Sequence, residues 1–266
     1  MSGSYFSSLQ RSEKPLRPPL GASDVEQRRA IYGVDAPGLV CALIVLGLGL
    51  ALTSAIVLVG LAPSFVPAIS SLVAAPLAAL FLFYAAVMLR SSLVGKMCIR
   101  DRLVAALALS GKERVLDAGC GRGLALIGCA KRLTSGKAVG IDLWSAKDLS
   151  NNSPAATRAN AAAEGVADRV EVETGDLRKL PFSDASFDAI VSMTVIHNIP
   201  SRDGRDQALR ELVRVLKPGG RIALFDLAFT PRYMEILRQA GMEVRELGRA
   251  RLWLMPCRSL LAQKKP

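Results

Sequence analysis

The sequence predicts an α/β fold: a doubly wound, mostly parallel seven-stranded sheet, preceded by a transmembrane helical hairpin. Two observations lead to this prediction. From Arg114 onward, short apolar segments alternate with segments of helical pattern, which is typical of a sheet covered by helices on both faces. The run from Ala36 to Leu89 contains no Asp, Glu, Lys, Arg or His, and it is long enough to cross a bilayer twice.

The apolar run divides into two segments at Ala62-Pro63-Ser64. Pro37–Leu61 and Phe65–Leu89 each exceed the roughly 20 residues that cross a bilayer. A buried hairpin in a soluble core is the alternative, but uncharged runs of this length argue against it. A secretory signal fits poorly, because the first segment starts late and a second one follows.

Basic residues flank the hairpin on both outer sides and are absent from its central break. Arg28 and Arg29 precede it, whereas Arg90 and Lys96 follow it. Because cytoplasmic flanks of membrane spans are rich in Lys and Arg, both ends of the chain are expected in the cytoplasm. The expected order is a polar, loosely ordered cytoplasmic arm (1–35), the transmembrane hairpin (36–90), a linker helix (91–110) and a soluble domain (111–266).

The elements of the soluble domain follow from local pattern. The predicted strands are Arg114–Ala118, Ala138–Asp142, Val170–Thr174, Phe187–Met193, Arg221–Asp226, Glu243–Leu247 and Leu252–Ala262. The predicted helices are Leu124–Leu133, Pro154–Glu164, Arg205–Leu216 and Pro231–Ala240. Only a short turn (Gly248–Arg251) separates the last two strands, so they should form an antiparallel pair at one edge of the sheet.

Charge and cysteine content restrict the partners. The formal net charge is +11, but no basic cluster is interleaved with aromatic residues, so a nucleic-acid partner is not expected and attraction to anionic lipid is the simpler explanation. The five cysteines include no C-x-x-C pair, which indicates a reducing compartment without structural disulfides. Met97–Arg102 resembles the translation of a transposon end used in preparing sequencing libraries, so no role is assigned to Cys98.

The most informative motif is a glycine turn after the first predicted strand. It reads Asp117-Ala-Gly119-Cys-Gly121-Arg-Gly123, and such a turn at the carboxyl end of a strand binds nucleotide-like ligands. A dinucleotide fingerprint, G-x-G-x-x-G, would need glycine where Leu124 stands. The small side chain of Cys120 inside the turn suits packing better than it suits a catalytic thiol.

An acid, Asp142, ends the second predicted strand. A carboxylate there can accept hydrogen bonds from both hydroxyls of a ribose. Dinucleotide-binding domains use an acid in the same way, so Asp142 alone does not choose between cofactors. Leu143 and Trp144 follow it and would wall an adenine ring, although packing in the core is an equal alternative for Trp144.

The turn resembles motif I of the class I S-adenosylmethionine (SAM)-dependent methyltransferases, and further blocks follow in the expected order. These blocks are Val139–Trp144, Gly175–Leu177, Phe187–Met193 and Val215–Arg221. From Tyr32 onward the chain is similar to bacterial methyltransferases of the UbiE/type 11 sort that carry a two-helix membrane anchor. The resemblance implies a Rossmann-like methyltransferase fold, SAM as cofactor, and a cytoplasmic catalytic domain at the bacterial inner membrane.

The resemblance also implies roles for the cofactor-binding residues. The glycines would pack against the methionine part of SAM, and Asp117 would lie near its amino group or order the turn. Asp176 would receive the adenine amino group, with a solvated turn acid as the alternative, and the amide of Leu177 would bind beside it. The full expected set is Asp117, Gly119, Cys120, Gly121, Gly123, Asp142, Leu143, Asp176, Leu177 and Met193, with no metal.

His197 is the only histidine and follows the fourth predicted strand. It is a candidate general base for the methyl acceptor, and a structural histidine that caps a loop is the alternative. The segment 145–153 is longer than a minimal connection, so it is interpreted either as a lid over the site or as an inert surface insertion.

Together these features predict a membrane-anchored methyltransferase that moves a methyl group from SAM to an unidentified small molecule or lipid. Its partners would be the bilayer and this acceptor. Two alternatives remain open at this point: a non-catalytic SAM-binding membrane sensor, and an NAD-linked oxidoreductase, which Leu124 disfavours. The sequence makes no prediction about oligomeric state.

Overall fold

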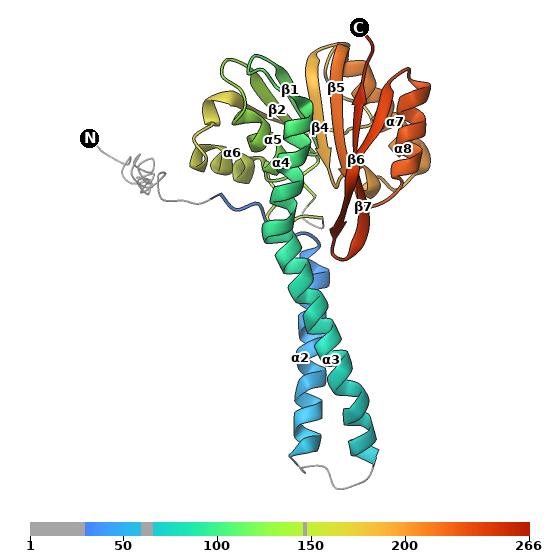
Figure 1. Cartoon of the computed structure of the whole chain (residues 1–266). Coiled ribbons are helices and arrows are strands. Elements are labelled where there is room, and N and C mark those ends of the chain that lie inside the picture. Colours follow the sequence, from blue (N-terminus) through green and yellow to red (C-terminus); the bar gives the residue numbers. More distant parts are fainter. Residues whose placement is uncertain (1–29, 60–65, 146–147) are drawn as a thin grey trace, which may run out of the picture.

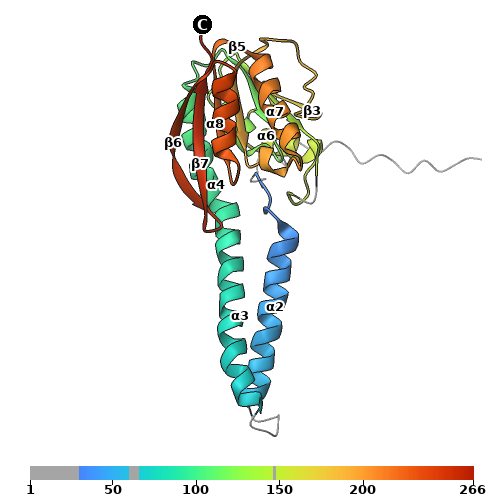
Figure 2. The ribbon, with the colours of Figure 1, turned by 90° about the vertical axis from the view of Figure 1, so that its right-hand side faces the viewer.

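Two antiparallel helices form a stem below an α/β domain in the computed structural model of the chain (Figure 1). They are α2 (Pro37–Leu58) and α3 (Val66–Arg90), and a perpendicular view shows them side by side along the stem (Figure 2). The structure describes residues 30–59, 66–145 and 148–266. The first 29 residues of the predicted arm and the break at 62–64 therefore lie outside the described residues.

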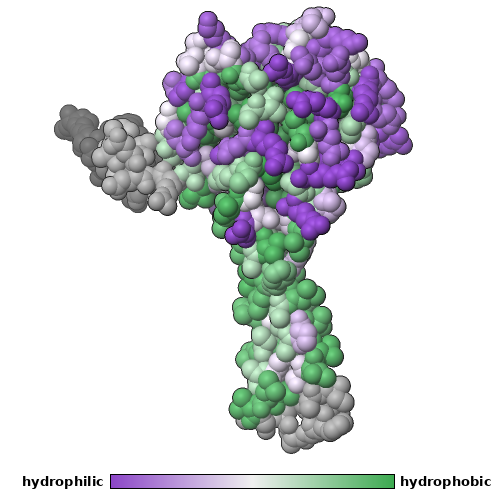
Figure 3. Space-filling model, viewed as in Figure 1, coloured by the Kyte–Doolittle hydropathy of each residue, from purple (hydrophilic) through white to green (hydrophobic). Residues whose placement is uncertain are grey.

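The stem is largely apolar on the face that Figure 3 shows. Val45 is 69% exposed and Leu58 77% exposed, so large apolar side chains point away from the neighbouring helix. The contact between the helices uses small residues such as Gly47, where an added Cβ would lie 2.8 Å from Cγ of Leu82. Both helices are long and apolar enough to cross a membrane.

The second helix of the stem continues into the α/β domain. A π-helical turn (Ser91–Gly95) follows α3 and leads directly into α4 (Lys96–Leu107). Ile99, Leu103 and Leu107 of α4 are buried in one of the two hydrophobic clusters of the domain. The stem is therefore joined to the domain by a continuous helix that packs against the sheet. It lies in the range where the sequence predicts a linker helix.

The sheet has seven strands and is mostly parallel, as predicted, and its strand order is β3-β2-β1-β4-β5-β7-β6. Strands β1 to β5 are parallel, and β7 is antiparallel to both β5 and β6. The strands are β1 (Arg114–Ala118), β2 (Lys137–Asp142), β3 (Val170–Thr174), β4 (Phe187–Met193), β5 (Leu216–Asp226), β6 (Glu243–Leu252) and β7 (Met255–Gln263).

Helices cover both faces of the sheet, and a separate hydrophobic cluster lies under each set. Leu103 of α4 and Leu126 of α5 belong to one cluster, whereas Leu209 of α7 and Tyr233 of α8 belong to the other. The remaining helices are α5 (Leu124–Ala130), α6 (Pro154–Ala163), α7 (Arg202–Val215) and α8 (Thr230–Gln239). Helix α7 begins three residues before the predicted start, because the Ser201 side chain accepts a hydrogen bond from the Gly204 amide and caps it.

The turn between the last two strands is not where the sequence predicts it. Strands β6 and β7 continue to the pair Leu252–Met255, so the loop consists of Trp253 and Leu254. Gly248, expected in the turn, lies at a register shift within β6 with φ of 147°. The prediction was wrong because glycine marks β-bulges as well as turns.

The end of the predicted arm is ordered, in contrast to expectation. Tyr32 is buried, and its hydroxyl donates to Glu164 at 3.0 Å. The Ile31 amide donates to Oδ1 of Asn160 at 3.0 Å, which fixes the segment against α6. Residues 30–35 are therefore part of the folded domain, because one aromatic side chain and several amides find partners there.

Candidate active site

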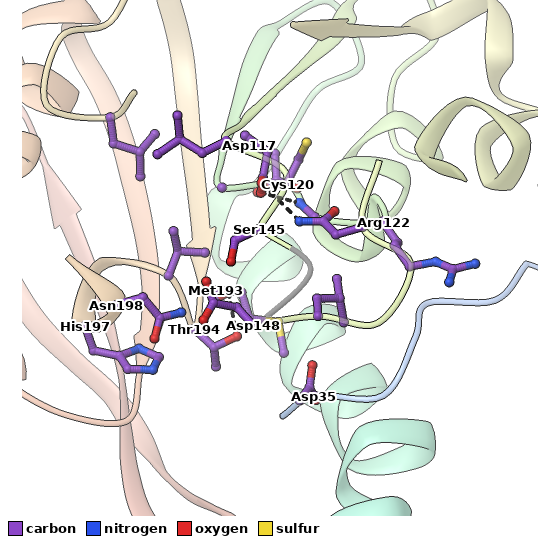
Figure 4. Close-up of a pocket in the computed structure, with 18 of the residues that line it drawn as sticks. Asp35, Asp117, Cys120, Arg122, Ser145, Asp148, Met193, Thr194, His197 and Asn198 are labelled. Carbon is purple, nitrogen blue, oxygen red and sulfur yellow. Dashed lines mark hydrogen bonds between the residues drawn. The ribbon is translucent and has the colours of Figure 1, made fainter. Parts of the chain in front are cut away.

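A pocket of about 660 Å³ lies between the carboxyl ends of the parallel strands and the root of the stem (Figure 4). This volume is typical of a site for a small molecule or cofactor. His197 and Asn198 lie on the opposite side of the pocket from Arg122, and Asp35 lies at the end nearest the stem. All of the predicted site residues except Gly123 line the pocket.

The glycine turn is held so closely that a side chain would not fit at its first glycine. Gly119 has φ of 80°, and an added Cβ would lie 2.3 Å from Cγ1 of Val195. Its amide donates to the carbonyl of Ile141 at 2.8 Å, which ties the turn to β2. Gly123, with φ of 85°, caps α5 instead of lining the pocket. At Gly119 and Gly121 the turn therefore brings backbone to the pocket wall.

Asp117 is buried beneath the turn, and its Oδ2 accepts a 2.7 Å hydrogen bond from the Leu126 amide in the first turn of α5. Burial raises the pKa of this carboxyl to about 7, and the nearby charge of Asp142 adds to the rise. Of its two predicted roles, ordering the turn is the one that this contact supports.

Cys120 is buried in the turn with its sulfur against the backbone of β2. An added Cβ at Gly140 would lie 2.8 Å from Sγ of Cys120, so the thiol fills the space that this glycine leaves. Burial raises the pKa of the Cys120 thiol well above its ordinary value, which disfavours the reactive thiolate. The geometry supports the predicted packing role.

Asp142 ends β2 and holds three donors of the chain itself. Its Oδ2 accepts from the Gly121 amide at 2.8 Å, and its Oδ1 accepts from the Trp144 amide at 2.6 Å and from Nδ2 of Asn152 at 3.2 Å. Since each carboxylate oxygen accepts about two hydrogen bonds, Oδ2 keeps one acceptor position for a ligand. Oδ1 of Asn152 is buried and has no partner within the described part of the chain, so two ligand hydroxyls, one donating to each oxygen, would satisfy both groups.

The predicted adenine side of the pocket is partly occupied by an ion pair. Arg178 binds Asp176 through two nitrogens, with Nη2 2.5 Å from Oδ2, and these bonds lower the pKa of Asp176. An adenine amino group would have to share this carboxylate. Leu177, Leu143 and Met193 line the same pocket. Trp144 does not, and its indole N–H donates to Oγ1 of Thr174 at 2.8 Å, which supports the packing alternative.

His197 lines the pocket and is oriented by an acid that the sequence analysis missed. Nδ1 of His197 contacts Oδ1 of Asp226 at the end of β5, and the His197 amide donates to Oδ2 of Asp226 at 3.0 Å. The Tyr233 hydroxyl also donates to Oδ2 of Asp226, at 3.2 Å. If Asp226 accepts the proton of Nδ1, Nε2 is the free acceptor nitrogen. The signal for Asp226 was present, because it ends a parallel strand at the same sheet edge as Asp142.

The segment 145–153, interpreted as a lid or an inert insertion, pairs with the chain that leads into the stem. Asp35 and Leu149 form an antiparallel bridge, and the Ala36 amide donates to the carbonyl of Asp148 at 3.2 Å. Ser145, Asp148, Leu149 and Asn152 of this segment line the pocket. Residues 146–147 lie outside the described chain. The segment is thus part of the pocket wall and is tied to the stem.

A buried ammonium group fixes the same junction from the side of α4. Nζ of Lys96 donates to the carbonyl of Gly33 at 3.0 Å and lies 3.3 Å from Oδ1 of Asp35. The Ser92 hydroxyl donates to Oδ2 of Asp35 at 2.9 Å. Burial lowers the pKa of Lys96, and the Asp35 carboxylate opposes that shift. Tyr32, Asp35 and Lys96 therefore line the stem end of the pocket, which sequence reasoning did not predict.

The fold is Rossmann-like, and folds of this class hold nucleotide-type ligands at the carboxyl edge of the sheet, where this pocket lies. Residues 115–220 match a family described as a methyltransferase domain. The chain is 35% identical over 156 residues to 27-O-demethylrifamycin SV methyltransferase of Amycolatopsis mediterranei, covering 57% of this chain and 52% of that protein. It is 35% identical over 128 residues to demethylmenaquinone methyltransferase of Lactiplantibacillus plantarum, covering 48% and 50%.

The chain thus spans about half the length of these curated relatives. Among solved structures, the YcgJ protein from Bacillus subtilis superposes with a TM-score of 0.54 at 16% identity, covering 63% of this chain and 98% of that one. The cyclase SpnF gives a TM-score of 0.53 at 21% identity, covering 64% and 81%. These two likenesses show the fold alone.

Residues 115–220 are similar to methyltransferase domains, and the relatives named above are methyltransferases by name, so these matches support SAM as the cofactor. The site fits this cofactor: Oδ2 of Asp142 and Oδ1 of Asn152 have acceptor capacity left for hydroxyl groups. The buried Asp117 lies beneath the turn that would hold a cationic ligand. The NAD-linked alternative loses its support, because both the family match and the relatives are methyltransferases.

Proposed function

We propose that the chain is a membrane-anchored enzyme that moves a methyl group from SAM to a hydrophobic small molecule or lipid. The observation that carries this proposal is the position of the pocket. Its wall includes Ala36, the residue before α2, and Lys96, the first residue of α4, so it reaches the root of both apolar helices. Anchoring would keep the site at a high local concentration of acceptors dissolved in the bilayer.

Two further observations support the class of acceptor and the orientation. By their names, the relatives given above act on a rifamycin derivative and on demethylmenaquinone. By analogy with them, the proposed acceptor of this chain is hydrophobic. Arg90 and the other basic flanks support a position of both ends of the chain, and of the catalytic domain, on the cytoplasmic side of the inner membrane.

Different residues of the pocket would bind the cofactor and position the acceptor. SAM supplies a methyl group that its positively charged sulfur already activates. Asp142 and Asn152 would bind hydroxyls of the cofactor, while the backbone of Gly119 and Gly121 forms the wall beside it. Holding the acceptor in line with the methyl carbon lowers the barrier most.

His197 and Asp226 would activate the acceptor. Nε2 of His197 accepts a proton from an O–H, N–H or S–H group, and the buried Asp226 carboxylate fixes the ring and stabilises the imidazolium that forms. A carbon acceptor would give up its proton to the same nitrogen. The role of His197 is thus general base, positioned by Asp226.

The test supplies SAM labelled in its methyl group to membranes that contain the overproduced protein, followed by identification of the labelled product. A labelled lipid or other hydrophobic compound, absent from control membranes, is the expected result. Calorimetric binding of SAM without any S-adenosylhomocysteine formed in membranes or extracts would contradict the proposal. That outcome would favour a non-catalytic SAM-binding sensor.

A further inference from the structure

The loop that joins β6 and β7 is built from residues that disfavour its backbone conformation. Trp253 has φ of 54° and Leu254 has φ of 66°, so both central residues of this two-residue turn are left-handed. Such turns favour Asn-Gly or Asp-Gly, because large side chains are strained at positive φ. Two bulky apolar residues at these positions suggest that something other than the stability of the turn keeps them there.

The same loop presents apolar side chains beside the root of the stem. Leu254 is 52% exposed and Met255 is 45% exposed. The Trp253 amide donates to Oγ of Ser91 at 3.3 Å, which ties the loop to the first residue after α3. Both ribbon views place the loop next to the junction of α3 and α4 (Figures 1 and 2). Leu93 and Val94, 57% and 55% exposed, extend the apolar surface along that junction.

Two exposed basic residues lie close in the chain to this surface. Arg251 lies on β6 opposite Pro256, next to the loop, and Arg90 ends α3. Both are exposed, and neither forms an ion pair with another residue of the described chain. Tryptophan with apolar and basic neighbours at the end of a membrane span is typical of the layer where lipid head groups meet acyl chains.

Trp253 belongs to the pocket as well as to the loop. It lines the pocket together with Asp35, Ala36 and Lys96, all at the stem end. Its indole nitrogen is buried and has no hydrogen-bond partner among residues 30–59, 66–145 and 148–266. An acceptor that leaves the bilayer beside Trp253 would therefore meet the pocket without crossing bulk water.

We propose that Trp253, Leu254 and Met255 form a third membrane contact, separate from the two helices. This contact enters the interfacial layer of an anionic bilayer and places the stem end of the pocket at the membrane surface. The acceptor would accordingly be an amphipathic lipid that enters laterally. The inference rests on the proposed membrane anchoring.

The chain offers a matched test, because Trp144 and Trp253 are its only tryptophans. The full chain is reconstituted into phosphatidylcholine–phosphatidylglycerol vesicles whose acyl chains carry bromine near the head group. In W144F the fluorescence reports on Trp253, and in W253F it reports on Trp144. We expect Trp253 to be quenched at least about threefold more strongly than Trp144, with emission shifted to shorter wavelength.

Alkaline extraction and flotation of the same vesicles separate the outcomes. If the protein stays with the vesicles and Trp253 is quenched no more than Trp144, the anchoring stands and the third contact is overturned. If the protein is released from the vesicles, the anchoring fails and this inference fails with it.

A second variant is expected to weaken the membrane contact without lowering the stability of the fold. L254G, made in the W144F background, places glycine where a two-residue turn of this type favours it, so thermal stability should not fall. Quenching of Trp253 should nevertheless decrease by about half or more, since the apolar side chain beside it is gone. A folded L254G variant with unchanged quenching would overturn the proposal.

Discussion

Three aspartates lie at or next to the ends of parallel strands, and their surroundings give them different chemistry. Asp117 is buried with a single amide donor, Asp142 holds three donors near the pocket, and Asp226 holds His197. Burial with a single donor raises the pKa of the Asp117 carboxyl. The same residue type therefore serves as a titrating group, a ligand-binding group and a positioning group.

The pKa of Asp117, raised by burial from 3.8 to about 7, predicts that SAM affinity depends on pH. A cationic ligand favours the ionised carboxylate, so binding releases a proton below about pH 7 and tightens as the pH rises. Affinity should increase about tenfold between pH 6 and pH 8, and level off above that. Isothermal titration calorimetry measures this, and the slope should be lost in D117N. An equal slope in both proteins would assign the effect to another group.

The pair of His197 and Asp226 predicts a defect in catalysis without a defect in cofactor binding. His197→Ala should lower methyl transfer about 100- to 1,000-fold, because removal of a general base has that effect, while SAM affinity stays nearly constant. In Asp226→Asn the ring loses the carboxylate that orients it, so methyl transfer should also fall while SAM affinity stays nearly constant. Undiminished methylation by His197→Ala would limit this residue to a structural role.

At the scale of elements, the junction between stem and domain consists of three segments held by buried polar contacts. Residues 30–36, the π-helical turn and the segment 145–153 meet around Asp35, which contacts Ser92, Lys96 and the bridge to Leu149. The first and third of these segments contribute residues to the pocket wall, and the π-helical turn leads to Lys96, which also lines it. A displacement of the stem would therefore shift residues of the pocket wall.

Asp35→Ala should destabilise the protein, because it leaves the buried Lys96 ammonium without its anion. Lys96 keeps the carbonyls of Tyr32 and Gly33, so the expected loss is about 1–3 kcal/mol in the free energy of unfolding. Asp35→Asn, which retains an acceptor for the Ser92 hydroxyl, should lose less. Thermal unfolding of the purified protein in detergent compares the two. Equal stability of Asp35→Ala and wild type would show that the carboxylate contributes little.

At the scale of the whole molecule, an apolar stem carries a domain whose visible surface is largely hydrophilic (Figure 3), in a chain of formal net charge +11. The two parts are continuous, since α3 passes through the π-helical turn into α4, and α4 is buried against the sheet. A bilayer would satisfy the exposed apolar side chains of the stem, and its anionic head groups would attract the net charge of +11.

This arrangement predicts the topology of the chain. A tag at the C-terminus should be digested by protease in inverted inner-membrane vesicles and protected in intact spheroplasts, because basic flanks stay on the cytoplasmic side. The protein itself should remain in the membrane after alkaline extraction. Digestion of the tag from the outer face would reverse the orientation, and release by alkali would contradict a spanning stem.

The sequence determined the local elements and the acids that end them. Strands Arg114–Ala118, Val170–Thr174 and Phe187–Met193 have the predicted bounds, because a short apolar run between turn residues carries its own signal. The glycine turn and Asp142 were predicted for the same reason, since a motif is a property of neighbouring residues. The length of the two stem helices was also predictable, because their uncharged residues are consecutive in the sequence.

Only the tertiary structure decided the contacts between distant segments. It brought Asp226 to His197, paired residues 34–36 with 148–150, and placed the turn of the last hairpin at Trp253 instead of Gly248. Local pattern does not contain these choices, because hydrogen bonds and burial across the sheet outweigh the turn propensity of one glycine and the polar composition of one arm. The position of the pocket at the root of the stem follows from these long-range contacts.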